Sequence, residues 1–344
     1  MEIKDLVREN IKRLEPYSSA RDEFQGNSND MVFLDANENP FENGVNRYPD
    51  PQQRTVKSLL SENKGVPQEN ILLGNGSDEV LDLIFRAFCE PHQDNIVTLP
   101  PTYGMYGVLA NINAVENIKI PLTDQFQPDL EKIYQAVNPR SKVIFICSPN
   151  NPTGNNFSKS VIEDLLENFK GLVVIDEAYV DFSTEESWVN RLDKYPNLIV
   201  TQTLSKAYGM AGIRLGICYA STFIISVLNR IKPPYNVNEL TQQKAIERLK
   251  KQKEVEAEIK DILKQRTALV SELKTVGFVS EIYPSNANFV LVKVDNATKR
   301  YDQLIEKGIV TRNRTTQQGC ENCLRLTIGT AEENEKLINT LKEL

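Results

Sequence analysis

Six short runs of apolar residues lie between positions 70 and 220 of the chain. They span residues 71–73, 95–99, 142–147, 172–176, 198–202 and 213–218. Within these runs the apolar residues are largely continuous instead of alternating with polar ones. This pattern is typical of strands that are buried on both faces of a mostly parallel sheet.

Helical patterns separate the runs. The clearest covers residues 77–88, where apolar residues recur at i, i+3, i+4, i+7 and i+8 from Val80 and where Ser77 suits an N-cap. The alternation of strands and helices predicts an α/β fold in which helices flank a mostly parallel central sheet.

The chain changes character after Pro233–Pro234. Residues 241–274 predict one long amphipathic helix with a solvated face. Two strands near 277–283 and 288–294, a helix near 297–307, a strand over 324–328 and a closing helix follow. We therefore predict a large domain over residues 40–236 and a small α+β domain over 237–344. Residues 1–39 are predicted to form an arm that packs against the small domain or a partner subunit.

Composition then restricts the chemistry. The chain has 344 residues and a single histidine, His92. One histidine excludes H-E-x-x-H zinc hydrolases and His-rich metal sites, and we predict no metal site. Acid–base chemistry then falls to Lys, Tyr, Asp or Glu. His92 lies in a polar segment between a predicted helix and a predicted strand, so we expect a solvated turn residue.

Charge and cysteine content exclude further classes of protein. The 40 basic and 47 acidic residues give a net charge of -7, which argues against binding to nucleic acid. No stretch of about 18 apolar residues and no signal peptide is found, so we predict a cytoplasmic protein without a membrane contact. The five scattered cysteines predict free buried thiols, and Cys320 and Cys323, in C-x-x-C spacing without a second pair, predict neither a zinc nor a redox site.

Five polar segments come after predicted strands or open a predicted helix. They span residues 74–79, 100–103, 148–154, 176–179 and 203–214. The carboxyl ends of parallel strands meet at one edge of a sheet, where α/β proteins bind ligands. We therefore expect these segments to lie together.

Two residues in these segments, Asp176 and Lys206, indicate which kind of ligand the site would bind. Asp176 ends an apolar run, and a buried carboxylate is costly unless it meets a cation. Lys206 follows another run and precedes Arg214, which suits an amine nucleophile beside an anion site. The glycine-bearing loop at 74–79 opens a helix, where free N–H groups favour a phosphate. Together with the turn at 148–154, these are the parts needed to hold pyridoxal phosphate.

The sequence resembles the fold-type I pyridoxal-phosphate-dependent aminotransferases over nearly its whole length. The resemblance depends on Asn151-Pro-Thr-Gly154, on Asp176-Glu-Ala-Tyr179, and on Ser205-Lys206 followed by Arg214. Within that superfamily it is most similar to the histidinol-phosphate aminotransferases. The segments that carry this closer similarity are 16–21, 34–40, 47–51, 100–106 and 323–330.

The resemblance implies roles for residues around a pyridoxal 5'-phosphate cofactor. Lys206 would bind it as a Schiff base and later move the proton, and Asp176 would pair with the protonated pyridine nitrogen. Asn151 and Tyr179 would form hydrogen bonds with the ring oxygen, and Tyr103 would stack on the ring. The groups implied to bind the cofactor phosphate are Gly76, Ser77, Asp78, Thr203, Ser205 and Arg214, joined by Tyr48 from the neighbouring subunit of a homodimer.

The resemblance also implies the substrates, which are L-histidinol phosphate and 2-oxoglutarate, giving imidazole acetol phosphate and L-glutamate in histidine biosynthesis. Arg325 and Arg312 would recognise the substrate's anionic groups, with Tyr17 beside them. Asn37 would line the substrate pocket, although a turn role suits it nearly as well. Arg314 is a second arginine close to Arg312, and we expect it to be a solvated loop residue.

Other functions fit the same cofactor motifs. One is a threonine-phosphate decarboxylase, and another is a transaminase for aromatic amino acids. A candidate of a different class is a non-catalytic, aminotransferase-like binding module. The cofactor motifs do not separate the first two from the leading function, whereas every identifiable catalytic position is present in the sequence, which argues against the third.

Overall fold

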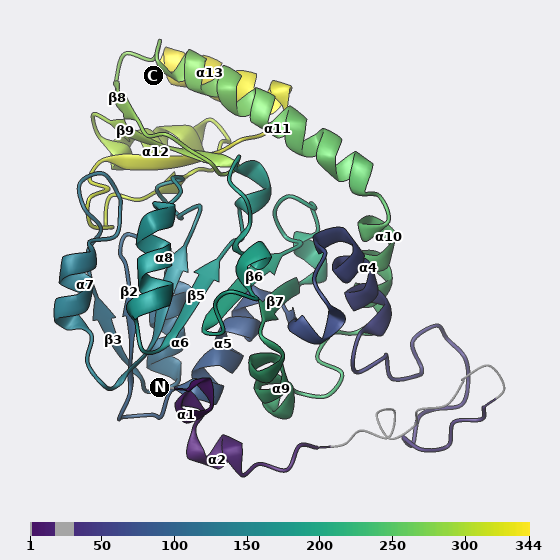
Figure 1. Ribbon diagram of the computed structural model, residues 1–344. Helices are drawn as coiled ribbons and strands as arrows, with labels where there is room; N and C mark the ends of the chain where they lie inside the picture. Colours follow the sequence, from purple (N-terminus) through teal and green to yellow (C-terminus); the bar gives the residue numbers. More distant parts are fainter. Residues whose placement is uncertain (1, 18–30) are drawn as a thin grey trace.

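The computed structural model describes residues 2–17 and 31–344. A seven-stranded sheet forms the centre of its larger part (Figure 1). In spatial order the strands are β1 Ile71–Asn75, β7 Leu215–Ala220, β6 Leu198–Thr203, β5 Leu172–Asp176, β4 Ser141–Cys147, β2 Asn95–Thr98 and β3 Glu116–Lys119. Neighbouring strands are parallel except where β7 pairs with β1 and β6. The predicted α/β fold with a mostly parallel sheet is confirmed.

All six apolar runs lie on strands of this sheet. The prediction missed β3, an edge strand of sequence Glu-Asn-Ile-Lys with exposed ends. An edge strand pairs on one side only and its polar residues can face water, so it leaves no apolar run in the sequence. The strand expected from residue 213 begins at Leu215, because residues 211–213 form a 3-10 turn and Arg214 takes a left-handed backbone conformation (φ 53°).

Helices cover both faces of the sheet. One apolar core contains side chains from α1 Ile3–Leu6, α2 Glu9–Lys12, α5 Ser77–Phe88, α6 Met105–Ile112 and α9 Thr222–Ile231. The core on the other face contains side chains from α4 Arg54–Lys64, α7 Leu130–Ala136 and α8 Lys159–Asn168. Short 3-10 helices connect these elements at Gln68–Asn70, Val180–Phe182, Trp188–Arg191 and Ala211–Ile213. Both faces of the sheet are therefore buried, as the continuous apolar runs require.

The amino-terminal helices lie on the larger part. Leu6, Val7 and Ile11 are buried in the core that α5 and α9 share. The side chain of Arg8 forms an ion pair with Glu90 (Nε to Oε2, 3.1 Å). We expected the arm to pack against the small domain or a partner subunit, whereas this part of it packs against the large sheet's own helices. Contact with a partner stays a prediction.

The smaller part is an antiparallel sheet with helices on its outside (Figure 1). Its strands, in spatial order, are β10 Arg312–Asn313, β11 Cys323–Thr327, β9 Phe289–Val294 and β8 Val279–Ile282. Its helices are α11 Gln252–Leu273, α12 Ala297–Glu306 and α13 Ala331–Glu343, and α11 runs beside α13. The predicted boundaries at residues 39 and 236 stay predictions.

The single long helix expected over residues 241–274 is two helices. Two residues separate helix α10 Glu239–Leu249 from the start of α11 at Gln252. Leu249 and Val255 are both buried in the core of the large sheet, although a straight helix would point residues six apart about 120° away from each other around its axis. The break at Lys250 and Lys251 lets both side chains face the same core, while Leu273 at the far end of α11 packs in the small part.

Gly216 brings the start of α5 against the sheet. It pairs with Gly74 of β1 and with Thr203 of β6. A Cβ atom on Gly216 would lie 2.2 Å from the backbone nitrogen of Ser77 and 2.3 Å from the carbonyl carbon of Gly76. Only a residue without a side chain fits here, since the backbone of the loop approaches the strand directly.

We therefore predict that Gly216→Ala destabilises the protein. Overpacking of this kind costs about 1–3 kcal/mol of unfolding free energy, which urea denaturation measures. Gly277→Ala is the matched control, because a Cβ there meets nothing within 4 Å. Its effect should stay within about 0.5 kcal/mol. Equal effects of the two substitutions would contradict the close approach.

Candidate active site

A cavity of about 130 Å³ lies at the carboxyl ends of β4, β5 and β6. Its lining residues are Ser77, Asp78, Tyr103, Cys147, Asn151, Asp176, Ala178, Tyr179, Thr203, Ser205, Lys206, Ala211 and Arg214. The cofactor-binding residues predicted from the motifs all line this cavity except Gly76, which directly precedes Ser77, and Tyr48. The structure thus brings together segments that are far apart in the sequence.

Asp176 is the last residue of β5 and is 4% exposed. Its Oδ2 accepts a hydrogen bond from the hydroxyl of Tyr106 at 2.8 Å, and its Oδ1 accepts one from the amide of Ala178 at 3.1 Å. Burial raises the pKa of Asp176, and these two donors act in the opposite direction. The carboxylate is therefore fixed in orientation by two uncharged donors.

Lys206 follows β6 in a tight turn and its side chain opens into the same cavity. Its Nζ lies 5.7 Å from the ring centroid of Tyr179. Burial lowers the pKa of Lys206, as do the positive charges of Arg325 and Arg214, while Asp176 and Asp78 raise it. The environment as a whole lowers the pKa of Lys206 and so increases the fraction of neutral amine.

The amino end of α5 forms one wall of the cavity. Gly76 is the N-cap residue with φ 78°, and its amide donates to the carbonyl of Arg214 (2.9 Å). The guanidinium of Arg214 lies 3.7 Å from a carboxylate oxygen of Asp78. Nearby, the hydroxyl of Thr203 donates to that of Ser205 at 3.0 Å. Free N–H groups at a helix start, a guanidinium and two hydroxyls together are suited to an anion such as a phosphate.

Tyr103 closes another side of the cavity. Its hydroxyl donates to Oδ1 of Asp78 at 3.0 Å, which fixes the ring beside the cavity. Its ring meets the ring of Tyr106 edge to face, with centroids 5.6 Å apart. A flat aromatic face held in this way can stack on a planar ligand.

Asn151 joins the two parts of the molecule. Its Nδ2 donates to the hydroxyl of Tyr179 at 3.4 Å, and its Oδ1 accepts a hydrogen bond from Arg325 of β11. Burial raises the pKa of Tyr179, so the phenol keeps its proton at neutral pH. The guanidinium of Arg325 also lies over the ring of Phe289, 5.0 Å from its centroid.

Three arginines gather on the small sheet near this junction. Arg312 lies opposite Arg325 in the pairing of β10 with β11, and Arg314 continues the ladder by donating its amide to the carbonyl of Cys323. Burial and the positive charges of Arg314 and Arg312 lower the pKa of Arg325 to about 10. In the described part of the chain, no partner accepts a hydrogen bond from the buried Nε of Arg325 or of Arg314. Positive charges held together in this way favour an anionic ligand.

The expectation that Arg314 is solvated is wrong. Arg314 is half-buried, whereas Arg312 is exposed. Burial lowers the pKa of Arg314, and the charge of Arg312 adds to the effect. The ladder bond to Cys323 holds the backbone at Arg314 against the small sheet, and the Nε of its side chain is buried.

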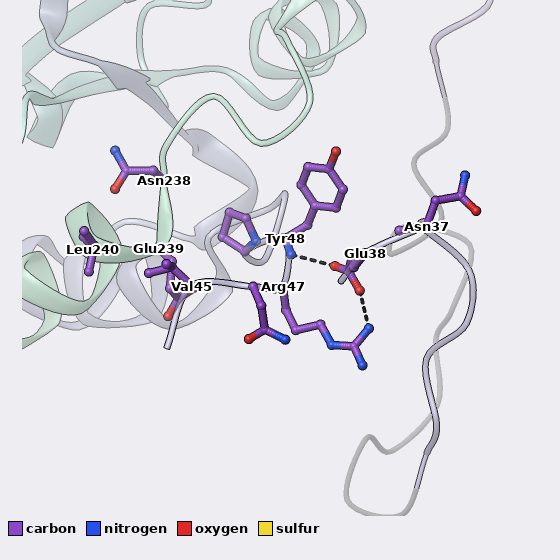
Figure 2. A pocket seen from close by; sticks show the side chains of 11 residues that line it. Asn37, Glu38, Val45, Arg47, Tyr48, Asn238, Glu239 and Leu240 are labelled. Atoms are coloured by element: carbon purple, nitrogen blue, oxygen red, sulfur yellow. Dashed lines mark hydrogen bonds and ion pairs between the residues drawn. The ribbon is translucent and has the colours of Figure 1, made fainter. Parts of the chain in front are cut away.

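Tyr48 and Asn37 lie in a different pocket (Figure 2). This pocket, of about 450 Å³, is formed by residues from segments 36–49 and 238–240. The ring of Tyr48 stacks on Tyr235 with centroids 4.5 Å apart, and its backbone amide donates to Glu38 at 2.6 Å. Neither Tyr48 nor Asn37 lines the Lys206 cavity of its own chain. Tyr17 is 75% exposed and lines neither of the two pockets.

The remaining sequence features lie outside the site. His92 is an exposed turn residue with φ 60°, as expected. All five cysteines are free and buried, also as expected. Among residues 2–17 and 31–344, no cluster of His, Cys, Asp and Glu suits a metal ion, and no helix combines the length and apolarity that crossing a membrane requires.

Tyr106 is a site residue that we did not predict. It stands in the segment 100–106, but only Tyr103 of that segment was given a role. The available signal was its position in the first turn of α6, three residues after Tyr103, in a mostly apolar helix whose buried residues include one with a polar tip.

Comparison with known proteins agrees with this geometry. The sequence matches the family described as aminotransferase class I and II over residues 28–341. A histidinol-phosphate aminotransferase of Flavobacterium johnsoniae is 67% identical over 344 residues, which cover 100% of this chain and 99% of the relative. One of Christiangramia forsetii is 61% identical over 342 residues, which cover 99% of this chain and 98% of the relative.

Solved structures share the fold. The histidinol-phosphate aminotransferase of Clostridium acetobutylicum superposes with a TM-score of 0.80 at 26% identity, covering 87% of this chain and 90% of that one. The enzyme of that name from Sinorhizobium meliloti, in complex with pyridoxal-5'-phosphate, has a TM-score of 0.79 at 24% identity, covering 86% and 82%. The chain belongs to the class I and II aminotransferases and, within them, to the family of histidinol-phosphate aminotransferases.

Proposed function

We propose that the chain is a pyridoxal-phosphate-dependent transaminase that moves an amino group between L-histidinol phosphate and 2-oxoglutarate. The observation that carries this proposal is that Lys206 and Asp176 line one cavity beside an anion-binding helix start. The names of relatives that are 50–67% identical over almost the whole chain support the substrate.

The residues of the cavity fit the cofactor. Asp176 is buried and its two hydrogen-bond donors are uncharged, so a protonated pyridine nitrogen would supply the missing cation. The anion-binding wall formed by α5 and Arg214 would hold the cofactor phosphate. Asn151 and Tyr179 would donate hydrogen bonds to the ring oxygen, and Tyr103 would stack on the ring.

Lys206 is the proposed catalytic residue. When bound, pyridoxal phosphate supplies an electron sink that stabilises negative charge on the substrate's α-carbon. Lys206 Nζ would hold the cofactor covalently until the amino group of the substrate takes its place. The freed amine would then take the proton from the α-carbon and return it in a later step. An amine accepts a proton only in its neutral form, and the lowered pKa of Lys206 increases the neutral fraction at neutral pH.

The arginines of the small sheet would bind the substrate's anionic groups. Arg325 reaches Asn151 across the two parts of the molecule, so it can hold a carboxylate or phosphate close to Lys206. We propose that Arg312 assists it with the substrate phosphate. The half-buried Arg314 lies beside them and would add to the positive charge that attracts the substrate's anionic groups.

The proposal includes a homodimer with shared active sites. Tyr48 lies apart from the cavity of its own chain and is 51% exposed. Val32, Leu34 and Phe41, on the same segment, are each at least 80% exposed, which is typical of a surface that another chain covers. A second copy packed here would bring Tyr48 of each chain to the cofactor phosphate of the other. We propose that Tyr17 and Asn37 contact the substrate across the same interface.

We predict that Lys206→Ala abolishes covalent attachment of the cofactor. After incubation with pyridoxal phosphate and borohydride reduction, mass spectrometry should find the label on the peptide that contains Lys206 in the wild type and nowhere in the variant. Lys250→Ala, at an exposed position outside the cavity, should be labelled like the wild type. Labelling of another lysine, or none in the wild type, would contradict the proposal.

A substrate panel tests the reaction itself. With 2-oxoglutarate as acceptor, histidinol phosphate should yield glutamate faster than aromatic amino acids do. Release of carbon dioxide from threonine phosphate, without turnover of histidinol phosphate, would show a lyase instead. Absence of any turnover by a protein that has bound pyridoxal phosphate would favour a non-catalytic binding module.

Substitution of the arginines should separate their roles. Arg325→Leu should lower kcat/KM for both histidinol phosphate and glutamate by about 30-fold or more, since removing a buried charge from an ionic contact costs about 2–5 kcal/mol. Arg312→Gln and Arg314→Gln should mainly raise KM for histidinol phosphate, whose phosphate carries more charge than a carboxylate. If only Arg314→Gln raised KM, then Arg314, and not Arg312, would be the arginine that assists Arg325 in binding the substrate phosphate.

A further inference from the structure

Tyr106 is the one group whose side chain donates a hydrogen bond to Asp176 in the described chain. The donor and acceptor oxygens lie 2.8 Å apart, and both side chains are buried. The ring of Tyr106 stacks on Phe145, with centroids 4.9 Å apart and an angle of 16° between the planes. The hydroxyl is therefore held in place by a rigid aromatic contact and cannot turn away from the carboxylate.

Packing alone does not account for this hydroxyl. A phenylalanine would keep the stacking on Phe145 and the edge contact with Tyr103. Tyr219 of β7 is a useful comparison, since it is also fully buried in the large part but its hydroxyl has no partner within the described residues. The bond from Tyr106 is thus a specific contact with Asp176 and not a general feature of buried tyrosines here.

The charge of Asp176 depends on a few neighbours. Burial is the largest influence and raises its pKa, and the hydrogen bond from Tyr106 is the largest influence that lowers it. The amide of Ala178 and the charge of Lys206 also lower it, whereas the charge of Asp78 raises it. The other titratable groups close to the carboxylate are Cys147, Tyr103 and Tyr179, whose pKa values burial raises, so that they stay neutral.

We propose that Tyr106 is a positioning residue that acts through Asp176, keeping this carboxylate ionised and oriented toward the ring nitrogen of the cofactor. The proposal rests on the proposed function, because it needs pyridoxal phosphate as the ligand. Without the hydroxyl, Asp176 remains buried but loses the donor that best stabilises its negative charge. It then offers less charge to a protonated ring nitrogen.

The test compares Tyr106→Phe with Tyr219→Phe, which each remove one buried hydroxyl from an aromatic ring. Apoprotein is titrated with pyridoxal phosphate, and bound cofactor is measured after equilibrium dialysis. Tyr106→Phe should weaken the affinity by about ten-fold or more, the size of a hydrogen bond to a charged group. Tyr219→Phe should leave the affinity within about two-fold of the wild type, because its hydroxyl has no partner to lose.

The pH dependence gives a second readout. Loss of the Tyr106 hydrogen bond raises the pKa of Asp176, so the carboxylate becomes protonated at higher pH as the solution is acidified. The affinity of Tyr106→Phe for the cofactor should therefore begin to fall at a higher pH than that of the wild type. A variant with merely looser packing would lose affinity equally at every pH.

A double-mutant cycle shows whether Tyr106 acts through Asp176. In the background of Asp176→Asn, which has no charge to stabilise, adding Tyr106→Phe should change the affinity by less than about two-fold. A full loss in that background, or wild-type affinity and pH dependence in Tyr106→Phe, would overturn the proposal. A wild-type protein that does not bind pyridoxal phosphate would instead contradict the proposed function.

Discussion

A carboxylate buried at the end of β5 is the constraint on which the site depends. Asp176 lies in the interior of an apolar sheet, where an ionised group is costly unless donors and a cation surround it. The structure supplies two donors from the chain, Tyr106 and Ala178. The remaining need is for a cation at the cavity, and the proposed cofactor meets it. Binding of the cofactor would therefore also offset the free-energy cost of burying the ionised Asp176.

The small part of the molecule contains a cluster of positive charges that an anion would balance. Arg325, Arg314 and Arg312 place three positive charges close together, and two of their nitrogen atoms are buried without a partner among the described residues. An anion relieves this repulsion in the way that a cation relieves the burial of Asp176. A ligand that reaches from the cavity at Asp176 to these arginines would therefore need a positive end at the carboxylate and a negative end at the small sheet.

The sequence predicts most of the sheet because buried parallel strands leave continuous apolar runs. It also predicts Lys206 and Asp176, since Asp176 ends such a run and Lys206 follows one, at the edge of the sheet where ligands bind. It does not predict β3, because an edge strand can consist largely of polar residues and then leaves no apolar run. Nor does it predict the break between α10 and α11, which depends on the packing of Leu249 and Val255 into the core of the large sheet. The roles of Tyr106 and Arg314 depend on contacts across the fold, with Asp176 and with Cys323, which lie far away in the sequence.

His92 has a consequence for the synthesis of the protein itself. It is the single histidine of the chain, it occupies an exposed turn, and it does not line the cavity, so the proposed reaction makes no use of it. If histidinol phosphate is the substrate, the protein helps to make histidine, which, like tryptophan, occurs only once in its own sequence. A cell short of histidine can therefore translate this protein with little demand on the scarce residue, and recovery from the shortage is not held back by its own composition.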